Sequence, residues 1–203
     1  MNFYVDKFLH MDGMQYKTNA PFEGKANYTF GILFRKLTVE DLSTHEKYTL
    51  KQTNILAQIL TLPIRIIVPS SIDFKLFKDD ICIGETFGVS APGDIKINIS
   101  NDEYTIYSHS ARAFSIMKKD DQVALIQRER AQSVARKYNI DVDASNVQPI
   151  IVFLMALLVD AIYYCNRYNR GLQLFPLYPP ISPKSEFYER TKWKSTDHNE
   201  DKK

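Results

Sequence analysis

The sequence is poor in the residues and motifs of common catalytic and metal chemistry. It contains two cysteines, Cys82 and Cys165, and neither has a partner at the spacing of metal ligands or of a redox motif. Its four histidines are scattered, with no second histidine nearby. The G-x-S-x-G elbow of serine hydrolases and the phosphate-binding P-loop are both missing. We therefore expect no catalytic residue, no metal site and no cofactor.

An excess of charge of one sign is also missing. The 26 lysines and arginines nearly balance 24 aspartates and glutamates. A net charge of +2 generates no strong field for a polyanion, so we expect no nucleic-acid partner. Asp6 and Lys7 interrupt the apolar run that a secretory signal would need. These features favour a cytoplasmic protein, in which two unpaired cysteines stay reduced.

Most of the chain has the pattern of short antiparallel strands. Between residues 28 and 142, runs rich in β-branched and aromatic residues alternate with polar turn clusters about every ten residues. The predicted strands are Tyr28–Phe34, Lys36–Leu42, Lys47–Thr53, Pro63–Val68, Ile72–Phe77, Ile81–Phe87, Asp94–Ile99, Tyr104–His109, Phe114–Met117, Gln122–Arg128 and Lys137–Val142, with Met1–Val5 as an edge strand. The run Asn54–Leu62 fits a short helix or a buried strand equally well.

A long apolar helix follows these strands at 147–165. Asp143, Ser145 and Asn146 supply capping side chains, and Pro149 falls in the first turn, where its missing N–H breaks no bond. Asp160 is the only charged residue between Ile150 and Ile162, and apolar residues cover every side of the cylinder. Such a helix is surrounded by protein or by lipid.

The predicted helix would be about 28 Å long, which matches both a bilayer core and a barrel interior. Its length therefore does not decide between lipid and protein surroundings. Flanking charge favours burial in protein, since Arg167 and Arg170 follow the helix while Asp141 and Asp143 precede it. A sheet of eleven or so strands must also close into a barrel or leave exposed edges. The interior of a barrel of that size is too wide to be filled by the side chains of its strands alone. We therefore predict a closed antiparallel β-barrel around a central apolar helix, with Asp160 near the mouth. A single-pass membrane anchor remains the alternative.

The order of elements from Asp94 to Cys165 resembles the tubby C-terminal-like superfamily, which includes phospholipid scramblases and LURP-one-related proteins. The similarity runs through EYTIYSH, RAFSIMKKDDQVALIQRER, YNIDV and PIIVFLMALLVDAIYY. It implies a barrel of about twelve strands threaded by the helix. Members of this family variously bind phosphoinositides or associate with membranes, so the resemblance implies a binding or membrane-peripheral module. The phosphoinositide-binding residues of tubby and the calcium-binding segment of scramblases have no counterpart here.

One basic cluster could bind an anionic lipid headgroup. Arg128, Arg130, Arg136 and Lys137 bracket the connection between the last two strands, and Arg128 and Arg130 share a strand face by parity. The alternative is a solvated rim, partly neutralised by Glu129. We expect a non-catalytic module with an anionic membrane lipid as its partner; the other reading is an enzyme with a site at the barrel mouth, where Asp160 is the acid to nominate.

The domain prediction is a barrel over residues 1–166 and an extended segment over 167–203. The second part contains four of the nine prolines, and Tyr178-Pro179-Pro180 excludes a helix there. We expect the apolar stretch from Leu172 to Ile181 to pack on the barrel and the last ten or so residues to be disordered.

Overall fold

Consecutive strands pair with one another in sequence order, and the first and last strands pair to close the ring. The computed structural model describes residues 1–10, 13–29, 33–53, 74–87, 94–110, 113–129 and 136–163. The strands are β1 (Asn2–His10), β2 (Gly13–Thr18), β3 (Phe22–Thr29), β4 (Leu33–Asp41), β5 (Lys47–Gln52), β6 (Phe74–Lys78), β7 (Ile81–Phe87), β8 (Ile95–Ile99), β9 (Asp102–Ser110), β10 (Ala113–Lys118), β11 (Asp121–Arg128) and β12 (Arg136–Val142). The predicted closed antiparallel barrel is confirmed.

Alternation along the strands separates an inner from an outer face. In β8 the side chains of Ile95, Ile97 and Ile99 are buried, while Lys96 and Asn98 between them are exposed. Residues paired across an antiparallel ladder point to the same face, so the inner side chains of all strands converge. They form one hydrophobic core together with the buried residues of the helix.

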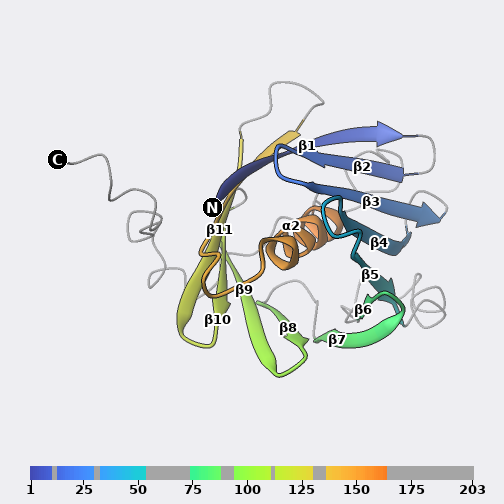
Figure 1. Ribbon diagram of the computed structural model, residues 1–203. Helices are drawn as coiled ribbons and strands as arrows, with labels where there is room; N and C mark the ends of the chain where they lie inside the picture. The colour runs from blue at the N-terminus through green and yellow to red at the C-terminus, as the bar shows by residue number, and fades with distance from the viewer. Residues whose placement is uncertain are drawn as a thin grey trace, which may run out of the picture.

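The helix α2 (Pro149–Tyr163) lies within the ring of strands (Figure 1). The helix was predicted over 147–165 with Pro149 in its first turn; Pro149 is instead its first residue, and Val147 and Gln148 precede it. All residues from Ile150 to Asp160 are buried, whereas Gln148 is exposed. At 15 residues α2 extends about 22 Å, and no helix in the described part of the chain is both long and apolar enough to cross a membrane.

Aromatic and small side chains fit α2 against the N-terminal strands. The rings of Phe3 and Phe22 lie 6.2 Å and 6.1 Å from that of Phe153, measured between centroids. Gly24 in β3 lies close against α2, because a Cβ there would lie 2.3 Å from a methyl carbon of Leu157. A larger side chain at this position would push α2 away from the wall.

The N-terminal strands differ most from the sequence prediction. Tyr28–Phe34 was predicted as one strand, but β3 ends at Thr29 and β4 begins at Leu33. The prediction missed β2 altogether. Met1–Val5 was predicted as an edge strand, whereas β1 pairs with both β12 and β2 and so completes the ring. Closure leaves no edge, which removes the main route to strand-mediated aggregation.

Several predictions concern residues outside the described ranges. They are the strand Pro63–Val68, the open choice at Asn54–Leu62, the end of the helix after Tyr163, and the extended segment 167–203. These stay predictions.

The connections divide the barrel into two ends. One end carries the hairpin turns after β4, β6, β8 and β10 and the loop 143–148 that leads into α2; we call it the helix-entry end. Asp79 and Asp80 have φ of 46° and 70°, and Ser100 and Lys119 both have φ of 56°. Tight two-residue hairpins require such positive values, and Asp tolerates them better than most residues. The opposite end carries the β11–β12 connection.

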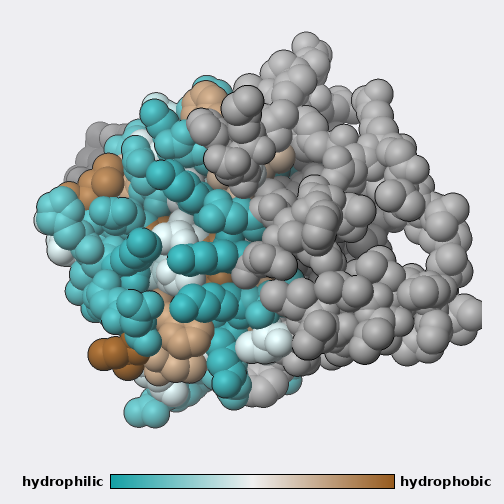
Figure 2. Space-filling model, turned by 90° about the vertical axis from the view of Figure 1, so that its right-hand side faces the viewer, coloured by the Kyte–Doolittle hydropathy of each residue, from teal (hydrophilic) through white to brown (hydrophobic). Residues whose placement is uncertain are grey.

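The described surface on the face drawn in Figure 2 is mainly hydrophilic, with isolated hydrophobic residues. Among the residues described, the large hydrophobic side chains that are exposed are Tyr4, Phe8, Leu42 and Ile81. Scattered apolar residues of this kind are normal on protein surfaces. On the described surface, cavities and charged groups are therefore better candidates for a functional site than the apolar residues.

Candidate functional site

A cavity of about 430 Å³ opens at the helix-entry end of the barrel. Its lining comes from the ends of β5 to β10 and from the loop that leads into α2. The polar lining includes Tyr48, Lys78, Asp102, Tyr104 and Lys118. Pockets of about 300–1,000 Å³ accommodate small molecules in many proteins. We call this cavity the entry pocket.

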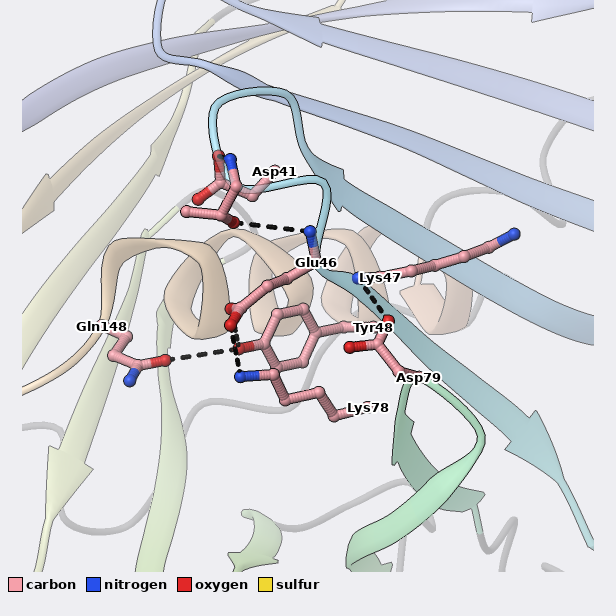
Figure 3. Close-up of polar contacts among 8 residues, drawn as sticks. Asp41, Glu46, Lys47, Tyr48, Lys78, Asp79 and Gln148 are labelled. Carbon is pink, nitrogen blue, oxygen red and sulfur yellow. Dashed lines mark hydrogen bonds and ion pairs between the residues drawn. The ribbon is translucent and has the colours of Figure 1, made fainter.

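One ion pair stands on the β5–β6 side of the entry pocket (Figure 3). The Lys78 ammonium donates to Oε1 of Glu46 at 2.6 Å and lies 5.6 Å from the centre of the Tyr48 ring. The Tyr48 hydroxyl lies 3.1 Å from Oε2 of Glu46 and 3.5 Å from Oε1 of Gln148. This group is therefore connected to the residue just before α2.

A second ion pair repeats this arrangement on the β9–β10 side. The Lys118 ammonium lies 2.8 Å from Oδ2 of Asp102 and 5.9 Å from the centre of the Tyr104 ring. It also lies 3.5 Å from the backbone oxygen of Asn146, in the loop before α2. Both ion pairs thus flank the start of the helix, whose N-terminal end carries the positive part of the helix dipole.

The charge states of these groups follow from their contacts. The hydrogen bond to Glu46 raises the pKa of Lys78, and the hydrogen bond to Asp102 raises the pKa of Lys118. Burial raises the pKa of Tyr104, and burial together with the bond to Glu46 raises the pKa of Tyr48. At neutral pH both lysines are charged and both tyrosines are neutral, so the pocket offers ammonium and phenol donors beside carboxylate acceptors.

The opposite half of the helix contains a buried ion pair of a different kind. Asp160 accepts hydrogen bonds from the Lys7 ammonium at 2.5 Å and from the Tyr16 hydroxyl at 2.7 Å, and a third from the Tyr138 hydroxyl. The side chains of Lys7 and Asp160 are 2% and 1% exposed. These four residues, which we call the Asp160 cluster, connect α2 to β1, β2 and β12.

The environment of Asp160 differs from the expected one. We predicted a carboxylate near the mouth whose polar end reaches water or backbone, but it is fully buried and held by side chains of the wall. Burial alone would raise its pKa; the Lys7 charge and the hydrogen bonds from Lys7, Tyr138 and Tyr16 outweigh burial and hold the pKa below its usual value. Asp160 is therefore ionised, and its contacts with Lys7, Tyr16 and Tyr138 hold α2 to the wall of the barrel.

This lowered pKa predicts a pH dependence of stability. Ionised Asp160 stabilises the fold fully above its unfolded-state pKa of about 3.9, and the contribution is lost as pH falls through the lower folded-state value. Urea unfolding should show a constant difference between wild type and Asp160→Asn from pH 7 to 5, shrinking below pH 4. Asp120→Asn, on an exposed turn, is the control. A difference already shrinking at pH 6 would contradict the lowered pKa.

The described residues of the predicted basic cluster, Arg128, Arg136 and Lys137, lie at the end opposite the entry pocket. Lys137 is half exposed on the outer face of β12, 3.7 Å from Oδ1 of Asp6. Arg128 pairs with Tyr138 across β11 and β12, which places it on the inner face, and its Nε is buried. Arg136 begins β12 opposite Lys7, and Arg130 lies outside the described residues. The wall thus separates Lys137 from Arg128.

Sequence reasoning missed the residues of the entry pocket. Lys78 and Lys118 each precede a turn with two aspartates, and such lysines are ordinary on a solvated hairpin. The local sequence gives no sign that each lies over a tyrosine. Within the described residues, no group of three or more His, Cys, Asp or Glu side chains could hold a metal ion.

Comparison with known proteins identified no matching family model, no similar curated protein and no similar solved structure. The resemblance to the tubby C-terminal-like superfamily therefore stays a prediction, and the function has to be inferred from the geometry of the chain itself.

Proposed function

We propose that this protein is a non-catalytic binding module that takes a small polar molecule into the entry pocket. The cavity of about 430 Å³ between the two Lys–carboxylate–Tyr groups is the observation that carries this proposal. Its walls come from the ends of strands in a closed barrel, and rigid scaffolds with variable ends commonly carry binding sites. Ile151 of the buried helix and Val147 of the loop before it line the base of the pocket.

Charge around the pocket favours a freely diffusing ligand over a headgroup in a bilayer. Asp79, Asp80, Asp120 and Asp121 are exposed on the turns of the helix-entry end, and Lys119 offsets only one of them. The cytoplasmic face of membranes carries a negative potential, which would repel this rim. A membrane contact would instead use the other end, where the predicted basic cluster lies.

Ligand-observed NMR with a library of amino acids, carboxylates, amines and phosphate compounds tests the proposal. Wild-type protein should bind at least one class, and Ala144→Trp should abolish binding because the indole would occupy the entry pocket, which Ala144 lines. Asn101→Trp is the matched control, since Asn101 is exposed on a neighbouring turn outside the lining. Binding that survives Ala144→Trp, or no binding by any class, would contradict the proposal.

Vesicle sedimentation separates a free ligand from a lipid headgroup. Wild-type protein should stay in solution with phosphatidylcholine vesicles containing phosphatidylserine or phosphoinositide. Sedimentation that salt abolishes, and that replacing Arg128, Arg130, Arg136 and Lys137 together by Ser abolishes, would instead assign an anionic lipid to the basic cluster.

A further inference from the structure

We propose that the ligand of the entry pocket is a small zwitterion with one ammonium group, one carboxylate group and an apolar side chain, as in a free amino acid or a dipeptide. This inference rests on the proposed function and names the class of ligand. It follows from the balance of charge in the pocket, from how weakly that charge is held, and from the apolar part of the lining.

The two ion pairs together are electrically neutral. Lys78 and Lys118 each face one carboxylate, Glu46 and Asp102 respectively. A ligand with a net charge would leave one of these four groups without a counter-charge on binding. A ligand with both signs replaces each broken pair by a new one, so neither a protein charge nor a ligand charge loses its partner.

Both pairs are accessible enough to exchange. The side chains of Lys78 and Glu46 are 36% and 38% exposed, and those of Lys118 and Asp102 are 28% and 40% exposed. Partly exposed ion pairs contribute little to folding stability, because solvent screens them. A ligand can therefore take the place of one partner without disturbing the barrel.

The surroundings distinguish the places of the two ligand charges. A carboxylate between the lysines would lie beside the start of α2, where the helix dipole favours negative charge. An ammonium group would meet Asp102 and the ring faces of Tyr48 and Tyr104, over which the lysine ammonium groups now lie at 5.6 Å and 5.9 Å. The pocket thus provides both an anion position and a cation position.

Apolar residues complete the lining. Ile83, Ile99, Val147 and Ile151 contribute to the same cavity, where Ile83 is partly exposed and the other three present a small apolar surface. A ligand made only of charged groups would leave this surface in contact with water. An aliphatic side chain on the zwitterion would cover it and gain the free energy of apolar burial.

Isothermal titration calorimetry with matched probes tests this class. The first series is leucine, isoamylamine, which lacks the carboxylate, and 4-methylpentanoate, which lacks the ammonium. The second is leucyl-leucine, its N-acetyl form and its C-terminal amide. In at least one series the zwitterion should bind at least about tenfold more tightly than either singly charged relative. A tenfold ratio of Kd corresponds to about 1.4 kcal/mol.

Variants assign each charge to its partner. Asp102→Asn should remove the preference for the zwitterion over the acid, and Lys118→Met should remove its preference over the amine. Lys96→Met is the matched control, because Lys96 pairs with Glu103 at 3.9 Å on the same wall but lies outside the pocket lining. The control should keep the wild-type Kd for every probe.

The outcomes separate this inference from the proposed function. Equal binding of zwitterion and singly charged probes would overturn the zwitterion while leaving the entry pocket as a binding site. Binding of none of these probes would also overturn it, and the proposed function would then be decided by the broader NMR library and the Ala144→Trp variant.

Discussion

Replacing Asp160 by Ala is expected to lower the free energy of unfolding by about 3–5 kcal/mol, because one partner of a buried ion pair is removed while the other stays buried. Lys7 would lose its counter-charge in an environment where its side chain is 2% exposed. The hydroxyls of Tyr16 and Tyr138 would lose their acceptor as well. Urea unfolding followed by circular dichroism measures the loss.

A fully apolar replacement of the Asp160 cluster separates loss of charge pairing from loss of packing. The combined variant Lys7→Met, Tyr16→Phe, Tyr138→Phe and Asp160→Leu should regain most of the stability that Asp160→Ala loses, because no polar group then stays buried. If Asp160→Ala alone costs less than about 1 kcal/mol, water must reach the site, and the cluster does not anchor α2.

Replacing Leu154 by Ala is expected to cost about 2–5 kcal/mol, because it deletes buried methyl groups and leaves a cavity that the surroundings fill only in part. Leu154 is 2% exposed and belongs to the core that α2 shares with the strands. Chemical denaturation of both proteins under identical conditions gives the difference.

Leu42→Ala is the matched control for this truncation. Leu42 is 46% exposed at the helix-entry end, and surface substitutions of this kind usually change stability by less than about 0.5 kcal/mol. A cost below about 1 kcal/mol for Leu154→Ala would contradict burial of this face of the helix.

The sequence predicted the C-terminal half of the barrel well, because that half has a strong alternating pattern. Ile81–Phe87 was predicted with the observed bounds, and β8 to β12 lie within two residues of the predicted ones. β8, β9 and β12 carry β-branched or aromatic residues at alternate positions, whereas β10 and β11 each have four consecutive buried residues between less buried ends. Local periodicity is enough when large side chains mark the inner face.

The same pattern is weak where α2 comes close to the wall. The inner face of β3 carries Phe22, Gly24 and Ala26; Leu157 and Phe153 of the helix occupy the space in front of Gly24, and Ala26 is fully buried. A strand whose inner face is made of small residues has little hydrophobic signal. The sequence therefore carries little signal for a boundary between β3 and β4; β2 was missed although Met14 and Tyr16 alternate on its inner face.

The candidate site is formed by residues that are far apart in the sequence and close in the fold, and no local sequence pattern predicts such contacts. Lys7 and Asp160 are 153 residues apart in the chain and 2.5 Å apart in space. Lys78 and Lys118 come together at one pocket because the connections alternate between the two ends of the ring. Each side chain taken alone resembles an ordinary surface lysine.

By itself the sequence determined most of the antiparallel strands, an apolar helix with Pro149 in its first turn and the need for a closed sheet, since these follow from periodicity, capping chemistry and the number of strand edges. Only the tertiary structure decided that β1 closes the ring against β12, that Asp160 forms an ion pair with Lys7 inside the ring, and that two ion pairs flank the entry pocket. Strand closure and charge pairing depend on distances between residues far apart in the chain, and such distances are fixed only when the whole barrel has formed.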